Sequence, residues 1–459
     1  MIELIKKFVR EEAERFGAKE DYIFRNNTGV DALDDNGAYF GFIHPGEENS
    51  GPYHDFSFVI FPTNNSEAWL ACLGIGSSGF KNDYDLARYP GPRRFFSKLI
   101  DDDGYCKSDF SDIETSLPKN FLKRDDLVHL KRTIEKYKTV LLVAQIIREP
   151  NSEEGKMRIS ALLAGYAKLR AWASNAAQRN SISNAIDAVI KKTKCDHLSD
   201  VTKLLLERKY VVLQGAPGTG KTRLAKLVAN ELKARTFFTQ FHAETSYSDF
   251  IYGIRPKLNS TDVSYEARNG ELLKSIKYAQ EYQNEKVVLI IDELNRANLA
   301  NVLGPIFYLF EHKQQSSNVT IELSPDQELN CIPANLYVLG TMNTADRSLA
   351  VVDFALRRRF AWYDLRPESI QNGCEGNVFF KDHFSKFAEI FDWYANSNEL
   401  TLQPGQGYFI ARDLNEMRNR IRYELLPLIR EYLQEGLLNN AREEFNNYFV
   451  AEIGQTLFE

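Results

Sequence analysis

A glycine-rich segment at residues 215–222 has the composition and spacing of a phosphate-binding loop. It follows the apolar run YVVLQ and precedes the helical pattern RLAKLVANELKA. Its glycines let backbone N–H groups surround phosphate oxygens, and the following helix directs its positive N-terminus toward them. In the pattern G-x-x-x-x-G-K-[ST], the lysine reaches the β- and γ-phosphates and the hydroxyl residue binds Mg²⁺. We therefore predict nucleotide binding by Gly215, Ala216, Pro217, Gly218, Thr219, Gly220, Lys221 and Thr222, with Thr222 also a metal ligand.

Two carboxylates, Asp292 and Glu293, end the apolar run that begins at Val287. Such a run is typical of a buried parallel strand, which would deliver both carboxylates to the carboxyl edge of a sheet. Asp292 would then bind Mg²⁺ through water, and Glu293 would polarise the attacking water. A helix N-cap followed by an acidic residue is the alternative for an isolated Asp-Glu pair. The phosphate-binding loop earlier in the chain favours the catalytic interpretation.

A third strand-like run, residues 336–340, leads into Asn343. A polar residue at the tip of such a strand could sense the γ-phosphate, although asparagine also favours simple turns. The basic run at residues 357–359 would by itself suit a solvated helix end. The γ-phosphate, however, needs a cation from outside its own loop, and arginine fingers raise hydrolysis rates by roughly 10³ to 10⁵. We predict that Arg358 or Arg359 reaches the nucleotide of a neighbouring subunit.

The elements that would position these residues form an α/β domain. From about residue 197, strand-like runs alternate with helical stretches, which predicts a parallel sheet flanked by helices over residues 197–370. Residues 371–459 are mostly helical and predict a lid domain. Residues 1–120 combine an N-terminal amphipathic helix with apolar stretches and turns, as in a small α+β domain. Helical periodicity over residues 121–196 predicts a helical connector.

Composition is that of a globular protein. The 459 residues are 43% hydrophobic and 26% charged, and the length favours two or three domains. The five cysteines are scattered without a C-x-x-C pair, which favours reduced thiols. The N-terminal helix carries charges throughout, unlike a signal peptide, and no apolar run reaches the length of a membrane span. We expect a cytoplasmic protein.

Four segments of the second half resemble the McrB family, the nucleotide-hydrolysing subunits of modification-dependent (type IV) restriction systems. They are Gln240–His242, Tyr247–Phe250 with Gly253–Pro256, Asp292–Asn298 and Met342–Phe360. The resemblance covers about residues 200–455, and the run from Met342 to Phe360 is much more specific than a phosphate-binding loop alone.

The resemblance implies an AAA+ homo-hexamer that hydrolyses nucleotide, with GTP favoured over ATP. It implies a McrC-like nuclease subunit as partner, and modified double-stranded DNA, bound through the N-terminal domain, as target in anti-phage restriction. Glu293 and Asn343 would activate water, whereas Arg296, Arg358 and Arg359 would act between subunits. Gln406 departs from the histidine-containing stretch that the family has before its Tyr-Phe pair.

The sequence also permits a different nucleotide and a different substrate. The chain contains no N-K-x-D motif, so any choice of guanine must be made by another pocket. AAA+ proteins of the MoxR type share D-E-x-N-R-A and use ATP, which leaves open an ATPase chaperone that remodels protein partners. No P-D…(D/E)-x-K cluster is present, and we therefore expect the chain to have no nuclease activity of its own.

The N-terminal segment offers weaker signals. Residues 1–120 hold 13 Lys/Arg against 21 Asp/Glu, and residues 121–200 hold 15 against 9. Because phosphate neutralisation drives DNA affinity, an acidic segment must contact DNA through a local patch. A base-flipping pocket needs stacking aromatics and cations, although such aromatics can equally form a core. The candidates are Phe56, Phe58, Phe61, Trp69 and Tyr89, with Arg88, Arg93 and Arg94.

Overall fold

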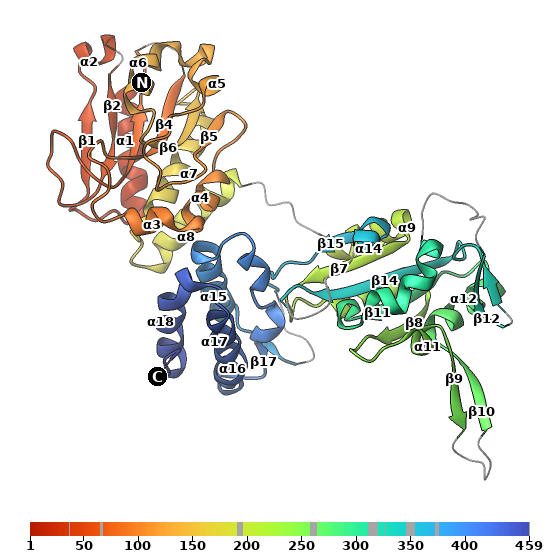
Figure 1. The fold of residues 1–459 in the computed structure, drawn as a ribbon. Helices are drawn as coiled ribbons and strands as arrows, with labels where there is room; N and C mark the ends of the chain where they lie inside the picture. The colour runs from red at the N-terminus through yellow and green to blue at the C-terminus, as the bar shows by residue number, and fades with distance from the viewer. Residues whose placement is uncertain are drawn as a thin grey trace. The chain divides into compact units, whose positions relative to one another are not determined.

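The computed structural model describes residues 1–35, 37–64, 68–190, 196–257, 264–310, 320–325, 327–345, 354–371 and 376–458. The chain divides into two compact units, each drawn in Figure 1. The first unit holds Met1–Thr193 with Asp392–Asn396, and the second holds Lys194–Phe391 with Ser397–Glu459.

The first unit is built on a six-stranded antiparallel sheet with strand order β1-β2-β3-β4-β6-β5. The strands are β1 (Ile23–Asn27), β2 (Tyr39–Ile43), β3 (Phe56–Phe61), β4 (Trp69–Ile75), β5 (Gly104–Cys106) and β6 (Leu141–Ile147). Successive side chains of a strand point to opposite faces. Accordingly Phe56 and Phe58 join one apolar cluster, whereas Val59 and Phe61 join another on the opposite face.

Helices cover both faces of this sheet and make the unit three layers thick. One cluster receives apolar residues from α1 (Ile2–Phe16), α7 (Glu153–Leu169) and α8 (Ala176–Val189). The other receives them from α5 (Lys119–Leu122), η1 (Asp125–Leu130) and α6 (Lys131–Tyr137). The remaining helices are α2 (Val30–Asp34), α3 (Tyr84–Arg88) and α4 (Pro90–Ser97). All strands in the middle of the sheet are therefore buried on both sides.

The prediction of a helical connector over residues 121–196 is wrong. Strand β6 pairs with β4 and β5, and α7 and α8 pack onto the same sheet. A strand buried on both faces is a continuous apolar run, and periodicity alone cannot distinguish such a run from a buried helix. The N-terminal α+β unit consequently extends through residue 193.

The second unit contains the predicted parallel sheet flanked by helices. Its five strands have the order β15-β7-β14-β11-β8, and all four neighbouring pairs are parallel. They are β7 (Tyr210–Gly215), β8 (Arg235–Gln240), β11 (Val287–Asp292), β14 (Leu336–Asn343) and β15 (Ala361–Asp364).

Each face of this sheet packs against its own helices. On one face lie α9 (His197–Arg208) and α10 (Lys221–Glu231). On the other lie α12 (Glu271–Glu281), α13 (Leu299–Leu303) and η3 (Gly304–Phe310). Short elements complete the domain: α11 (Tyr247–Phe250), η2 (Leu294–Arg296), α14 (Phe354–Arg359), and the antiparallel pairs β9 (Tyr252–Lys257) with β10 (Ser264–Asn269) and β12 (Ile321–Ser324) with β13 (Gln327–Leu329). Figure 1 shows the β9–β10 hairpin extending away from the sheet.

A helical segment follows the sheet domain, and we call residues 376–391 and 397–458 of the second unit the lid. Its helices are α15 (Lys381–Tyr394), α16 (Leu414–Arg420), a π-helical turn at Ile421–Leu425, α17 (Leu426–Gln434) and α18 (Arg442–Ile453). Shorter pieces are η4 (Glu399–Leu402), η5 (Gln406–Phe409), η7 (Asn439–Ala441) and the antiparallel strands β16 (Val378–Phe379) and β17 (Ile410–Ala411). Within the described part of the chain, no helix has both the length and the apolar character needed to cross a membrane.

Candidate nucleotide-binding site

The glycine-rich loop joins β7 to α10 at the carboxyl edge of the sheet. Gly218 and Gly220 have φ angles of 78° and 86°, a left-handed conformation that glycine adopts without a Cβ clash. Helix α10 begins at Lys221, so its N-terminal N–H groups face the loop. The Lys221 ammonium donates to the Gly215 and Ala216 carbonyls at 3.0 and 2.9 Å and to Asn343 Oδ1 at 2.6 Å. These residues lie where the strand–loop–helix pattern predicts them.

Asp292 ends β11 within hydrogen-bonding distance of the loop. Its Oδ1 accepts from the hydroxyls of Thr222 at 2.7 Å and Thr341 at 2.6 Å. A hydroxyl next to a buried carboxylate is a pair of hard oxygen donors, which is the kind of set that Mg²⁺ prefers. Thr222 and Asp292 therefore suit the ion that accompanies a bound nucleoside triphosphate.

Glu293 adopts a conformation that non-glycine residues seldom occupy. Its φ and ψ angles are 55° and 49°, in the left-handed region. Its backbone N–H donates to Thr341 Oγ1 at 3.1 Å, which supports this turn of the chain. Its carboxylate accepts from the Asn343 amide at 2.7 and 2.9 Å. Asn343 thus contacts both the phosphate-binding lysine and the predicted catalytic carboxylate.

Two residues of this network are not among those predicted from the sequence. Thr341 is buried and joins Asp292 to the backbone of Glu293. The sequence could have indicated Thr341, because residues two apart on a strand share a face and Asn343 is a candidate site residue. Asn295 donates to the Asn343 carbonyl at 3.2 Å, and its own buried Oδ1 has no hydrogen-bond partner among the described residues. Asn295 belongs to the D-E-x-N-R-A motif, but no pattern in the sequence assigns it a role in this network.

The lid contacts the loop through η5 and the glycine before it. The N–H groups of Gly405 and Gly407 donate to the carbonyls of Pro217 and Gly218 at 2.8 and 2.9 Å. The Gln406 side chain donates to the Thr219 carbonyl at 3.0 Å. The residue that departs from the family pattern therefore contacts the phosphate-binding loop directly.

The three candidate arginines have different surroundings. Arg296 forms an ion pair with Glu293 at 3.3 Å, and Arg358 is exposed. Arg359 is buried, with its guanidinium 5.5 Å from the centre of the Phe307 ring. Part of the specific run, residues 346–353, lies outside the described residues. Of the two arginines predicted to act on a neighbouring subunit, Arg358 is the exposed one.

Comparison with known proteins shows which family the AAA+ part of the chain resembles. Residues 210–360 match the model of the AAA domain, dynein-related subfamily. The EcoKMcrB subunit of a type IV methyl-directed restriction enzyme from Escherichia coli K12 is 42% identical over 178 residues, which cover 37% of this chain and 38% of that protein. These matches support a McrB-family AAA+ protein.

A second curated relative is more distant. Component YdiS of the type II restriction enzyme BsuMI from Bacillus subtilis strain 168 is 26% identical over 203 residues, covering 36% of this chain and 59% of that protein. The chain thus spans less than two thirds of the length of either curated relative. Among solved structures, the RuvB Holliday junction branch migration motor of Thermotoga maritima covers 43% of this chain and 49% of its own, at 20% identity and a TM-score of 0.23. The α/β AAA+ fold predicted from the sequence is confirmed by the domain match together with the parallel sheet.

The N-terminal candidates of this McrB-family protein are not arranged as a base-binding pocket. Phe56, Phe58 and Trp69 lie in one apolar cluster of the sheet and Phe61 in the other, each at most 3% exposed. The proposal that they stack on a flipped base is therefore wrong, because their rings are needed in the core. Tyr89 is half-buried and packs edge-on against Tyr394.

The three candidate arginines of the N-terminal segment lie on α3 and α4 and are partly engaged within the first unit. Arg88 is exposed, with its guanidinium 5.9 Å from the centre of the Tyr84 ring. Arg93 donates to the Lys107 carbonyl at 3.3 Å, and Arg94 donates to the Asp392 carbonyl at 2.8 Å. The guanidinium groups of Arg93 and Arg94 thus hold backbone segments in place.

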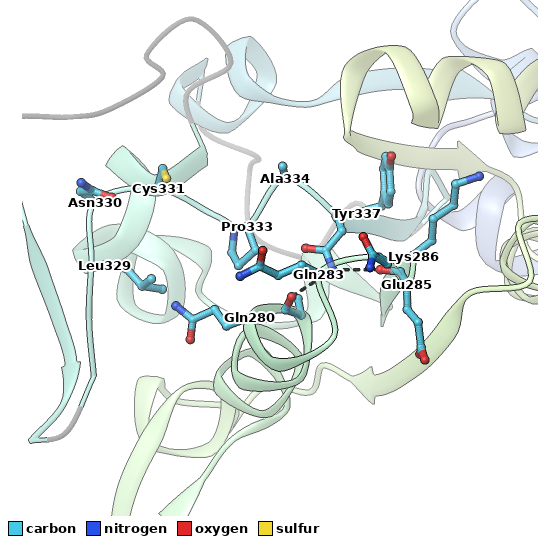
Figure 2. Close-up of a pocket in the computed structure, with 13 residues that line it drawn as sticks. Gln280, Gln283, Glu285, Lys286, Leu329, Asn330, Cys331, Pro333, Ala334 and Tyr337 are labelled. Atoms are coloured by element: carbon cyan, nitrogen blue, oxygen red, sulfur yellow. Dashed lines mark hydrogen bonds between the residues drawn. The ribbon is translucent and has the colours of Figure 1, made fainter.

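A cavity of about 630 Å³ lies at the opposite, amino end of strands β11 and β14. Figure 2 shows its mixed lining, with the polar side chains of Gln280, Gln283 and Lys286 beside apolar residues such as Leu329 and Pro333. Asn335 donates to the carbonyls of Ala279, Tyr282 and Glu285 at 2.8–3.0 Å, which ties the end of α12 to the start of β14. This cavity is separate from the nucleotide site, because Asp292 and Asn343 lie at the carboxyl ends of the same strands.

Proposed function

We propose that this chain is the nucleotide-hydrolysing motor of a McrB-like restriction system. It would form a homo-hexameric ring, hydrolyse GTP in preference to ATP, and act with a McrC-like nuclease subunit on modified double-stranded DNA in anti-phage defence. The observation that carries the proposal is the continuous network from Lys221 through Asn343 to Glu293. It joins a phosphate-binding group to a water-activating group, which is what a nucleoside triphosphatase requires.

The chemistry assigned to each residue follows from its contacts. Lys221 and the backbone N–H groups of the loop would bind the β- and γ-phosphates, and Glu293 would accept a proton from the attacking water. Asn343 would hold the Glu293 carboxylate in place, since its amide donates to both carboxylate oxygens. Thr222 and Asp292 would hold Mg²⁺, which neutralises charge on the phosphates when bound.

A neighbouring subunit would complete the site. The proposal assigns the trans-acting role to Arg358, because its side chain is exposed while Arg359 packs against Phe307. Arg296, which pairs with Glu293, would act at the same boundary between subunits. Arg359 would instead support α14, the helix that carries Arg358.

The proposed preference for GTP rests on the resemblance to the McrB family, because the chain has no N-K-x-D motif. The rival proposal is an ATPase of the MoxR type that remodels protein partners, and the acidic charge of residues 1–120 favours it. The McrB-family match favours the restriction motor.

Steady-state hydrolysis distinguishes the two. The purified full chain is assayed with GTP and with ATP at equal concentrations, alone and with a McrC-like protein encoded beside it. GTP turnover stimulated by that partner, together with DNA cleavage that requires it, supports the restriction motor. ATP turnover that ignores the partner supports the remodelling ATPase.

The control variant is Glu293→Ala. Loss of a general base typically lowers turnover by roughly 10² to 10⁴. The variant should still bind nucleotide, because Lys221, Thr222 and Asp292 remain. Turnover by Glu293→Ala equal to that of the parent chain would remove Glu293 from the catalytic role.

A further inference from the structure

The first unit has a basic outer face that the nucleotide chemistry does not use. Residues 119–138 contain seven Lys/Arg and three Asp/Glu, whereas residues 1–118 contain 12 Lys/Arg and 21 Asp/Glu. Five of the basic residues are exposed on α5, α6 and the turn between α5 and η1, and we call them the basic face: Lys119, Lys123, Lys131, Arg132 and Lys136. Positive charge is therefore denser on this layer than over residues 1–118 and 139–193 of the same unit, which together hold 20 Lys/Arg and 25 Asp/Glu.

The fold explains why these side chains point outward. The same layer buries Phe121, Leu127, Leu130 and Ile134 against the second apolar cluster of the sheet. The inner side of the layer is thus committed to the core, and the lysines occupy its solvent side.

Neighbouring acids neutralise little of this charge. Asp126 accepts hydrogen bonds from Arg124 and Arg148, and Glu135 forms an ion pair with Lys138. Four members of the basic face, namely Lys119, Lys123, Lys131 and Lys136, form no ion pair with any residue that the structure describes. Arg132 has an exposed ion pair with Asp35 at 3.6 Å, and ion pairs between two exposed side chains are weak. Asp125 is exposed on η1 and offsets one charge.

We propose that the basic face binds the phosphate backbone of nucleic acid. This inference rests on the proposed function, in which the N-terminal unit contacts DNA. Lysines act as point charges, and they lack the planar fork with which arginine reads a guanine edge. The basic face would therefore hold the duplex without reading its sequence, and recognition of a modified base would fall to other residues of the unit.

The test compares two triple variants of the full chain. Lys123→Gln/Lys131→Gln/Lys136→Gln removes three charges from the basic face. Lys19→Gln/Lys81→Gln/Lys98→Gln removes three exposed charges elsewhere on the same unit and serves as the matched control. Binding of a short fluorescein-labelled DNA duplex is measured by anisotropy over a series of salt concentrations.

Each lost phosphate contact should lower the slope of log K against log salt by about 0.9. The slope measured for the first variant should therefore be smaller in magnitude than that of the parent chain by roughly 3. The control should keep the slope of the parent chain. Equal losses in both variants would mean that net charge alone is responsible and would overturn the inference. Unchanged binding by the first variant would also overturn it, and would leave DNA binding by the parent chain, and so the proposed function, intact. A parent chain that binds no DNA would overturn the inference and the DNA-targeting part of the proposed function together, while hydrolysis would remain.

Discussion

The hydroxyl of Thr341 provides the sharpest test of the site geometry. It donates to Asp292 at 2.6 Å and accepts from the N–H of Glu293 at 3.1 Å, and its side chain is 1% exposed. Thr341→Val keeps the shape and removes both bonds. A hydrogen bond to a charged group contributes about 1.5–3 kcal/mol, and an orphaned buried N–H costs about 1–3 kcal/mol.

If much of that free energy acts in the transition state, kcat should fall by roughly 10- to 100-fold, since about 1.4 kcal/mol corresponds to a factor of ten. The assay is steady-state phosphate release, with nucleotide binding and thermal unfolding measured on the same samples. Thr341→Ser is the matched control, because it restores the hydroxyl and should recover most of the turnover. A Thr341→Val protein with the kcat of the parent chain would refute the idea that this hydroxyl positions Glu293. Equal loss of kcat in both variants would mean that the methyl group matters as much as the hydroxyl, because valine keeps the methyl group and serine keeps the hydroxyl.

Three further changes test other parts of the structure. Gly405→Ala places a Cβ 2.1 Å from the backbone of Gly218, so nucleotide affinity in a titration should fall while the helical content by circular dichroism stays constant. Burial opposes ionisation of Asp55, but N–H donors from residues 81–83 outweigh it and lower its pKa. Its contribution to stability should therefore be complete above about pH 4 and lost as the pH falls through the lowered folded pKa, and acid unfolding of Asp55→Asn should lack this component. Arg93→Ala/Arg94→Ala would weaken DNA binding if these arginines served a base-flipping pocket. The double variant should instead lower thermal stability more than DNA affinity, because both guanidinium groups donate to backbone carbonyls.

The nucleotide site was predictable because its chemistry is local in sequence. Gly215–Thr222 and Asp292-Glu293 each follow an apolar strand directly, so the sequence shows both the side chains and the elements that carry them. That Asn343 lies between Lys221 and Glu293 depends on the order of the strands, which no local pattern encodes.

The N-terminal unit was less predictable for a related reason. Its middle strands are covered on both faces, so β6 lacked the alternation that marks a half-buried strand and was assigned to a helix. The aromatic residues Phe58 and Trp69 attracted a functional interpretation, because burial against a second layer of helices is not visible in sequence. In the sequence, the lysines of α5 and α6 show only that the segment is basic. That they share one exposed face follows from the packing of these helices on the sheet, which the sequence does not show.

The order of strands in the second unit also sets the width of the reaction site. Strand β14 lies between β7, which leads into the phosphate-binding loop, and β11, which carries Asp292. Adjacent strands are about 4.8 Å apart, so the loop and the acidic pair rise from strands roughly 10 Å from each other. That interval leaves room for a phosphate group, its ion and a water molecule side by side. A sheet with β7 and β11 adjacent would halve the interval and bring the same residues too close for a reactant to enter between them.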